Sequence, residues 1–344
     1  MRKGIWLLLI TFVSIMVLSA CGTSGDDSSN GSTSGENDVE EGDANTTDEV
    51  YTIGATQIVE HPSLDAAYEG FQKALEDAGL EVEYDFQSAQ NDQNNAVTIA
   101  NNFVADGVDL IFANSTPSAQ SALNATKDIP ILFTSVTDAV ESGLVEGMDQ
   151  PGENITGVVD LHPDSIKQTV EFIDQYFEGA TIGLIYSAGE ANSVAQIEAV
   201  NQAVEGTSLS TSEATVGNSS EVQQAATSLV GDADVFFIIT DNTVVSALEA
   251  VIGVAEEQDI PLLVGEPDSV KRGGFATFGI DYFTIGYRTG EMAVEILTGE
   301  KTTADIPVEI PPSMQLFINK EAADAQGVEW NEDWDADAEL LEKE

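Results

Sequence analysis

Short apolar runs alternate with amphipathic segments along most of this chain. The clearest pair joins an apolar run at 181–186 to an amphipathic segment at 190–204 through a small polar turn. Runs of the first kind predict buried strands, and segments of the second kind predict helices. We expect strands at 51–59, 80–86, 108–113, 129–134, 181–186, 209–215, 235–240, 260–264, 275–280, 308–310 and 315–318, and helices at 64–78, 94–105, 117–126, 166–176, 190–204, 221–229, 243–257 and 283–297.

Strands that alternate strictly with helices favour parallel sheets with right-handed crossovers. The alternation breaks near 158–163 and then restarts, which predicts an α/β fold of two doubly wound parallel-sheet lobes. We expect a multi-crossing hinge between them and a ligand cleft where they meet. The predicted parts are a first lobe at 51–160 with 282–310 returning to it, a second lobe at 161–281 with 311–330 returning, and an acidic tail at 331–344.

The first 21 residues have the pattern of a targeting segment rather than of a folded element. Arg2 and Lys3 precede an apolar core at 5–17, which is too short for a membrane span. The sequence L-S-A-C then ends at Cys21 and resembles a bacterial lipobox, whose cysteine is lipidated. Residues 22–50 are almost free of apolar side chains and predict a disordered acidic tether. We therefore expect a protein anchored by its N-terminal lipid on the extracellular face of the cell membrane.

The composition excludes several classes of partner and cofactor. With 61 acidic against 11 basic residues the net charge is -50, so nucleic acid is not an expected partner. This charge suits a surface protein in brine or alkaline medium, or simply an acidic secreted protein. One cysteine leaves no internal disulfide and no multi-cysteine metal site. No phosphate-binding glycine motif follows any predicted strand, so we expect neither a nucleotide cofactor nor a metal.

Polar turns follow the predicted strands, and parallel strands bring such turns to one edge of each lobe. Hydroxyls and helix N-termini there can hold a carboxylate, while Glu190, Asp241 and Asp281 can accept bonds from an ammonium group. The set therefore suits a small zwitterion such as an amino acid. The alternative for each residue is an ordinary cap or turn. The candidate ligand-binding residues are Thr56, Gln57, Ser115, Thr116, Thr137, Asp138, Ser187, Glu190, Asn192, Ser193, Asp241, Asn242, Asp281 and Tyr282.

Several segments resemble one protein family. They read HPSLD at 61–65, TPSAQ at 116–120, GEANS at 189–193, DNT at 241–243 and GIDY at 279–282. With the lipobox, they resemble the substrate-binding lipoproteins of ABC transporters with the type I periplasmic-binding fold, in the branch that includes tryptophan- and other aromatic amino-acid-binding proteins. The resemblance implies a monomeric receptor, not an enzyme, that closes its lobes on an aromatic amino acid and delivers it to a membrane permease.

Other functions stay open at this point. A sugar or signalling-molecule receptor of the same fold, or a sensor that feeds a membrane kinase, would share the same alternation. Tyr186, Tyr282 and Phe283 are candidates for stacking on a ligand, with core packing as the alternative. The three tryptophans lie in the signal segment or the tail, which counts against a sugar site, and the missing phosphate loop counts against an enzyme with a Rossmann-like lobe.

Overall fold

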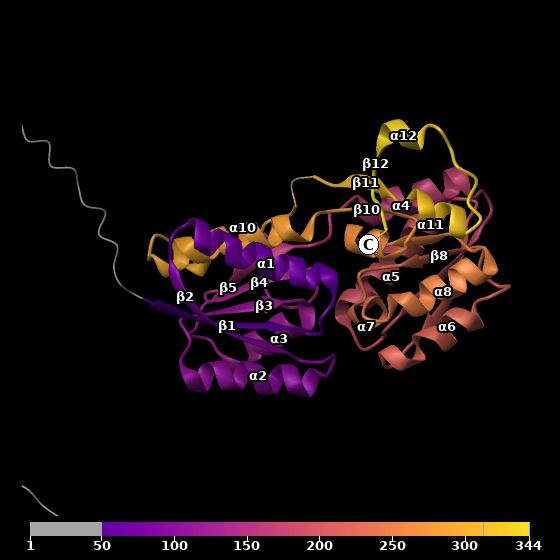
Figure 1. Ribbon diagram of the computed structural model, residues 1–344. Helices are drawn as coiled ribbons and strands as arrows, with labels where there is room; N and C mark the ends of the chain where they lie inside the picture. The colour runs from indigo at the N-terminus through magenta and orange to yellow at the C-terminus, as the bar shows by residue number, and fades with distance from the viewer. Residues whose placement is uncertain (1–49, 312, 344) are drawn as a thin grey trace, which may run out of the picture. The chain divides into compact units, whose positions relative to one another are not determined.

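The computed structural model describes residues 50–311 and 313–343, which fall within one compact unit. Cys21, its lipobox and nearly all of the predicted tether lie outside these residues. In the described part of the chain no helix is long and apolar enough to cross a membrane. The fold consists of two α/β lobes, each built on its own sheet (Figure 1).

The first lobe has a five-stranded, fully parallel sheet in the order β2-β1-β3-β4-β5. Buried aliphatic and aromatic side chains give its central strands the continuous apolar runs that parallel strands show. Its strands are β1 (Val50–Gln57), β2 (Glu81–Ser88), β3 (Leu110–Asn114), β4 (Ile131–Val136) and β5 (Ile155–Val159), and its helices are α1 (Pro62–Asp77), α2 (Gln93–Asp106), α3 (Thr116–Ala125) and, much later in the chain, α10 (Tyr282–Leu297).

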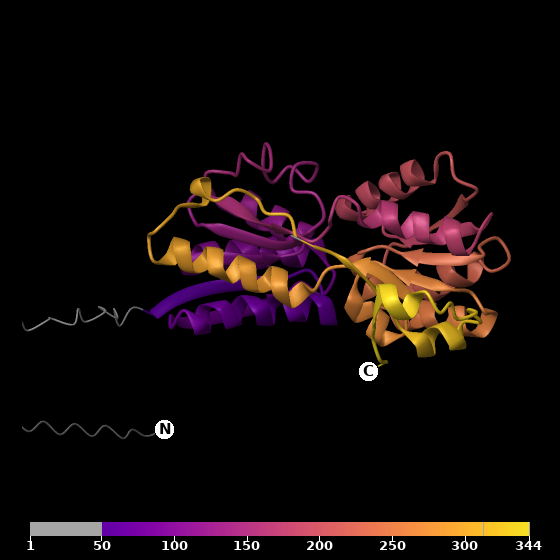
Figure 2. The ribbon, with the colours of Figure 1, turned by 90° about the horizontal axis from the view of Figure 1, so that it is seen from above.

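The helices cover the two faces of this sheet in pairs. α2 and α3 pack on one face through Phe103 and Ala119, while α1 and α10 share the core of the other face through Phe71 and Met292. Figures 1 and 2 show α1 and α10 side by side, although two hundred residues of sequence separate them. Their backbones approach closely because Gly286 faces the α1 backbone: a Cβ there would overlap the carbonyl oxygen of Ala67.

The second lobe has seven strands in the order β12-β11-β10-β9-β8-β6-β7. Neighbouring strands are parallel except β10 and β11, which are antiparallel. The chain enters β11 directly after returning from the first lobe, without a crossover helix, so this pair departs from the parallel pattern expected from the sequence. The strands are β6 (Thr181–Tyr186), β7 (Ser210–Thr215), β8 (Val235–Ile238), β9 (Leu262–Val264), β10 (Ala276–Gly279), β11 (Gln315–Ile318) and β12 (Ala338–Leu340).

Helices also cover both faces of the second sheet. One apolar core contains side chains of α4 (Ser165–Tyr176), α5 (Ala191–Val204) and α11 (Lys320–Ala325). The other contains side chains of the helices α6, α7, α8 and α9. Their bounds are α6 (Val222–Ser228), α7 (Asn242–Val245), α8 (Leu248–Gln258) and α9 (Pro267–Arg272), and two 3-10 turns, η1 (Ser219–Glu221) and η2 (Thr303–Asp305), complete the loops.

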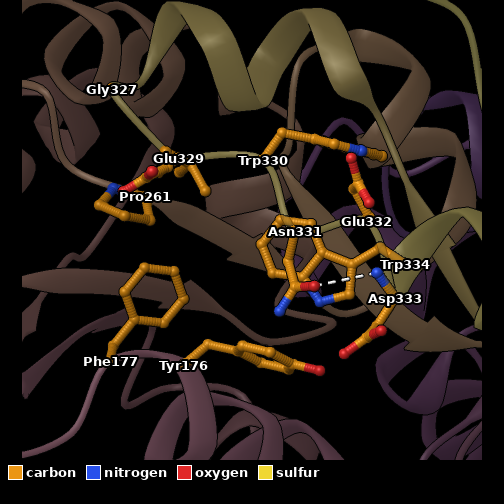
Figure 3. A pocket seen from close by; sticks show the side chains of 11 residues that line it. Tyr176, Phe177, Pro261, Gly327, Glu329, Trp330, Asn331, Glu332, Asp333 and Trp334 are labelled. Atoms are coloured by element: carbon orange, nitrogen blue, oxygen red, sulfur yellow. Dashed lines mark hydrogen bonds between the residues drawn. The ribbon is translucent and has the colours of Figure 1, made fainter.

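The segment after residue 330 is part of the second lobe rather than a separate acidic tail. It forms α12 (Trp334–Asp337) and then β12, which pairs with β11. Trp334 is buried, with its ring centroid 5.7 Å from that of Phe172 and 5.3 Å from that of Phe275. Figure 3 shows Trp330 and Trp334 on one side of a surface hollow whose other side carries Tyr176 and Phe177. These aromatic contacts attach the segment despite its negative charge.

Within residues 50–311 and 313–343 the chain passes from one lobe to the other at three places. It passes from β5 to α4, from β10 to α10, and from the segment after η2 to β11. The strand expected at 308–310 is reduced to a single bridge between Val158 and Glu309. A side-chain bond from the Tyr282 hydroxyl to Asp160 Oδ2, 2.7 Å long, links two of the crossings to each other.

Candidate functional site

A small cavity lies where the two lobes meet, at the carboxyl ends of their parallel strands. Its volume is only about 10 Å³ in this structure, room for about one water molecule, so a larger ligand requires the lobes to move apart. The first lobe, the second lobe and the crossings between them all contribute side chains. The lining residues are His61, Leu64, Ser135, Thr137, Asp160, Asn192, Thr240, Asn242, Val245, Glu266 and Tyr282.

Hydrogen bonds between the lobes surround this cavity. Gln196 Nε2 donates to Thr137 Oγ1 over 3.2 Å, and Asn91 Nδ2 donates to Thr243 Oγ1 over 2.9 Å. Gln93 Nε2 donates to the carbonyl oxygen of Gly189 over 3.3 Å. Each bond joins a side chain of one lobe to a residue of the other. The cavity is therefore enclosed only while the lobes are in contact.

Four polar atoms of the cavity lining are buried and have no hydrogen-bond partner among the described residues. They are His61 Nδ1, Ser135 Oγ, Asp160 Oδ1 and Asn192 Oδ1. Buried polar atoms nearly always find partners, because each one left unpaired costs about 1–3 kcal/mol. Ser135 also has a φ of 55°, a conformation that non-glycine residues seldom adopt. A group of such atoms around one cavity indicates a site where a ligand or an ordered water supplies the missing partners.

The cavity is electronegative. Burial is the main cause that raises the pKa of Asp160 to about 6, and the nearby Glu266 carboxylate adds to it. The pKa of Glu266 is also raised, again mainly by burial. No lysine or arginine is among the described residues that line the cavity. An occupant that carries a positive charge and several hydrogen-bond donors would complement these acceptors.

Glu190 does not line the cavity, and its carboxylate is already occupied. It accepts bonds from Asn242 Nδ2 over 2.6 Å, from Thr243 Oγ1 over 2.7 Å and from the Thr243 backbone N–H over 3.1 Å. It thus binds the N-terminal turn of α7, where the helix dipole also favours a negative charge. Glu190 holds two loops of the second lobe together, rather than presenting a free carboxylate.

Asp241 and Asp281 are helix caps in this structure. Asp241 accepts from the Val244 backbone N–H at the start of α7 and from Ser193 Oγ, both over 2.7 Å. It also accepts from the Ser187 backbone N–H over 2.6 Å. Burial raises the pKa of Asp241 to about 7, and the adjacent Glu190 charge adds to this shift. Asp281 is exposed and caps α10 through the Thr284 backbone N–H over 2.7 Å. For these two residues the capping alternative describes the contacts present.

The other residues predicted from the sequence divide into two groups. Thr137, Asn192, Asn242 and Tyr282 line the cavity. The rest lie beside it or have partners elsewhere: Gln57 bonds Asp65 and Asn114, Thr56 and Thr116 are buried with unpartnered hydroxyls, Ser115 bonds Ser118 with a φ of 101°, Asp138 caps the turn at Val140 and Glu141, and Ser187 and Ser193 bond Asp241.

The cavity also contains polar residues that the sequence analysis did not select. These are His61, Ser135, Asp160, Thr240 and Glu266. His61, Ser135 and Glu266 follow predicted strands, which is the same signal that selected the other candidates. Thr240 is instead the last residue of a predicted strand, and Asp160 lies in the break of the alternation at 158–163. Asp160 was recognised only as part of the crossing between the lobes. Nothing in the spacing separates a side chain that faces the cavity from one that caps its own helix.

Residues 52–340 match the ABC transporter substrate-binding protein family. The chain belongs to this family. It is 45% identical over 278 residues to the tyrosine-binding protein of Clostridioides difficile, an alignment that covers 79% of this chain and 80% of the relative. As a member it is a solute-binding protein rather than an enzyme, acts in the extracellular or periplasmic space, and works with a membrane permease.

Solved structures agree with the family assignment. A conserved domain protein from Vibrio cholerae has a TM-score of 0.82 at 36% identity, covering 86% of this chain and all of that one. The ABC domain in complex with L-Trp from Streptococcus pneumonia has a TM-score of 0.80 at 32% identity, covering 85% of this chain and all of its own. The ligand-free, open structure of a Clostridium difficile substrate-binding protein with adhesive properties has a TM-score of 0.63 at 40% identity, covering 86% of this chain and all of its own.

Proposed function

We propose that this protein is the lipid-anchored binding component of an ABC importer and captures an aromatic amino acid between its two lobes. One observation carries the proposal: an enclosed cavity between the lobes is lined by buried polar atoms without protein partners. All four atoms can accept a hydrogen bond from a donor, and one belongs to a carboxyl group. A small molecule with an ammonium group meets that demand.

The amino group is assigned to Asp160 and Asn192. Their unpartnered atoms, Asp160 Oδ1 and Asn192 Oδ1, lie on opposite lobes and are both acceptors. This assignment replaces the one made from the sequence, because Glu190 and Asp241 are already bonded to backbone N–H groups and Asp281 is exposed. An amino acid bonded to both lobes would stabilise their contact.

The ligand's carboxylate is assigned to the first lobe. Ser135 Oγ is a hydroxyl without a partner and can donate. Thr116, at the start of α3, also has a buried hydroxyl without a partner among the described residues, but it is not part of the cavity lining. Hydroxyls and backbone N–H groups can hold a carboxylate without an arginine, which fits a cavity that has none in its lining.

The comparisons support an aromatic ligand and a closed arrangement of the lobes. One relative is named a tyrosine-binding protein, and one solved neighbour contains L-Trp. The fit to that complex, with a TM-score of 0.80, exceeds the fit to the ligand-free open structure, with 0.63, although the open protein is more similar in sequence. The lobes here are therefore arranged more like those of the ligand-bound relative.

A thermal-shift screen of the mature protein tests the proposal. The panel contains the twenty amino acids, with glucose and myo-inositol to represent the sugar-receptor alternative. A ligand at a hundred times its dissociation constant adds about 2.7 kcal/mol to the free energy of unfolding, which raises the melting temperature measurably. We expect aromatic amino acids to give the largest shifts. If only a sugar, or no amino acid, raises the melting temperature, the proposed function is wrong.

Anchoring is tested separately through Cys21. Cys21→Ser removes the only thiol of the chain, so a lipidated protein would lose its attachment. We expect the variant in the medium or as an unprocessed precursor, as measured by cell fractionation and mass spectrometry. A processed variant that stays in the membrane fraction would contradict lipid anchoring and leave the ligand assignment untouched.

A further inference from the structure

The surface hollow of the second lobe that Tyr176, Phe177, Trp330 and Trp334 line, here called the aromatic hollow, has no part in the proposed capture of an amino acid. Its volume is about 650 Å³, within the range of about 300–1,000 Å³ typical of small-molecule sites. It lies at the amino ends of the strands, because Phe177 comes shortly before β6 and Pro261 directly precedes β9. The cavity between the lobes lies at the carboxyl ends, and the two sites share no lining residue.

The rings of the aromatic hollow are held in fixed positions. Figure 3 shows Trp330 and Trp334 on one side and Tyr176 and Phe177 on the other. The ring centroid of Trp334 is 5.3 Å from that of Trp330 and 5.1 Å from that of Tyr176, both edge to face. Trp330 Nε1 also donates to Asp335 Oδ2 over 3.4 Å. Because the rings are positioned before any molecule binds, less entropy is lost on binding.

The charge around the aromatic hollow is negative. Glu329, Glu332 and Asp333 line it with exposed side chains, and no lysine or arginine is among the described residues of the lining. Within residues 50–311 and 313–343 none of these three carboxylates takes part in a hydrogen bond or an ion pair. Carboxylates that the protein leaves unpaired attract a cation from solution and repel an anion.

One ring of the aromatic hollow already interacts with a cation of the protein itself. Lys320 Nζ is 4.3 Å from the centroid of the Trp330 ring, within the distance of about 6 Å over which an aromatic face attracts an ammonium group. Lys320 is not a lining residue, so its ammonium group does not fill the hollow. Trp330, Tyr176 and Phe177 are half-buried and therefore still accessible to a second cation. Quaternary ammonium groups are the usual ligands of such groups of rings.

One buried donor in the lining has no partner. Trp334 has 2% of its surface exposed, and its Nε1 atom forms no hydrogen bond among the described residues. An indole N–H can only donate, so the missing partner is an acceptor. That acceptor comes from a water molecule or from the occupant of the hollow, so an oxygen atom next to the cation improves the fit.

We propose that the aromatic hollow binds a small methylated ammonium cation that carries an oxygen atom, with choline as the simplest probe. The cation lies against the rings of Trp330 and Tyr176, and the three lining carboxylates compensate its charge. A neutral molecule of the same shape would gain only the apolar contact with the rings. This site is independent of the amino-acid cavity, because it lies at the opposite edge of the second sheet.

Tryptophan fluorescence of the mature protein tests the proposal directly. Trp6 precedes Cys21, and the other two tryptophans both line the hollow, so the signal reports on this site alone. The probes are choline and its neutral carbon analogue dimethylbutanol, at an ionic strength held constant with sodium chloride. We expect choline to give a saturable change and dimethylbutanol to bind at least about tenfold more weakly.

Two variants separate a specific site from general attraction to an acidic surface. The combination of Glu329→Gln, Glu332→Gln and Asp333→Asn should bind choline at least about tenfold more weakly than the parent. The matched control changes three exposed acidic residues of the loop after β4 to their amides, namely Glu141, Glu146 and Asp149. The control alters the net charge by the same amount and should bind choline like the parent. Circular dichroism shows whether both variants are folded.

Several outcomes would overturn the inference. If choline gives no saturable change with the parent, or binds no more tightly than dimethylbutanol, the hollow is not a site for a methylated ammonium cation. An equal loss of choline affinity in the lining variant and in the control would show that only the overall charge attracts the cation. If the lining variant does not fold, the comparison of choline with dimethylbutanol in the parent decides the matter. None of these results bears on the capture of an amino acid between the lobes.

Discussion

Replacing Asp160 with asparagine should change stability and binding in opposite directions. Burial raises the pKa of Asp160 from 3.8 to about 6, so between these values the folded protein binds more protons than the unfolded chain. Stability therefore falls as the pH rises through this window. Because the pKa is raised by about two, the ionised Asp160 lowers the free energy of unfolding by about 3 kcal/mol at pH 7. Asp160→Asn carries no such charge, and its amide oxygen can still accept from the Tyr282 hydroxyl.

We therefore expect the ligand-free variant to be up to about 3 kcal/mol more stable than the parent at pH 7, and similar to it below about pH 4. Binding should weaken, because a charge-assisted hydrogen bond contributes about 1.5–3 kcal/mol, or roughly ten- to 150-fold in affinity. The parent's affinity should also fall as the pH drops below about 6, where Asp160 takes up a proton, while the variant's affinity stays flat between pH 5 and 7.

Urea denaturation from pH 4 to 8 and isothermal titration with the best amino acid from the screen measure these effects. Asp164→Asn is the control. Asp164 lies four residues after Asp160 and its side chain is exposed, so this variant removes the same charge from a solvated position. The control should change neither quantity appreciably. Tight binding by Asp160→Asn at pH 7, equal to that of the parent, would refute the assignment of the ammonium group to this carboxylate.

Three further changes test the rest of the structure. Glu190→Gln should lower the free energy of unfolding by about 1–3 kcal/mol, because a buried carboxylate that accepts five bonds loses its charge; an unchanged urea midpoint would contradict this role. Gly286→Ala should lower the free energy of unfolding by about 1–3 kcal/mol or more, because the added methyl group overlaps the α1 backbone. In the same urea experiment Gly253→Ala should raise it by up to about 1 kcal/mol, because open space surrounds the added methyl group. With a net charge of -50, the denaturation midpoint should rise between 0.1 and 1 M sodium chloride, and a flat or falling midpoint would rule out strong self-repulsion.

The alternation of strands and helices was enough to predict the two-lobed α/β fold, because a buried parallel strand must be apolar along its whole length. The run at 181–186, for example, is β6 with the bounds expected. The strand β11 was predicted at 315–318, but its antiparallel direction was not, because apolar content does not reveal strand direction. Trp334 was assigned to an acidic tail, because most residues around it are charged and a single apolar residue among them does not predict a buried position.

The edge of the sheets that carries the site could be predicted, but the individual contacts could not. A carboxylate after a strand can face the cavity, as Asp160 does, or bond to a helix N-terminus, as Glu190 and Asp241 do. The choice depends on side-chain direction and on neighbours from distant parts of the chain. Asn242 and Glu190 are 52 residues apart, and no local pattern contains their bond.

The position of α10 in the sequence has a consequence for how the chain is made. Side chains of α10 share with Phe71 and Phe112 the core on one face of the first sheet, yet α10 follows all but the last two strands of the second sheet. A nascent chain that has only reached residue 160 exposes part of that apolar face to solvent. The first lobe can be completed only after most of the second has been synthesised. Until then the uncovered face is a place for chaperone binding or aggregation, and a fragment that ends at the first crossing is not an independent folding unit.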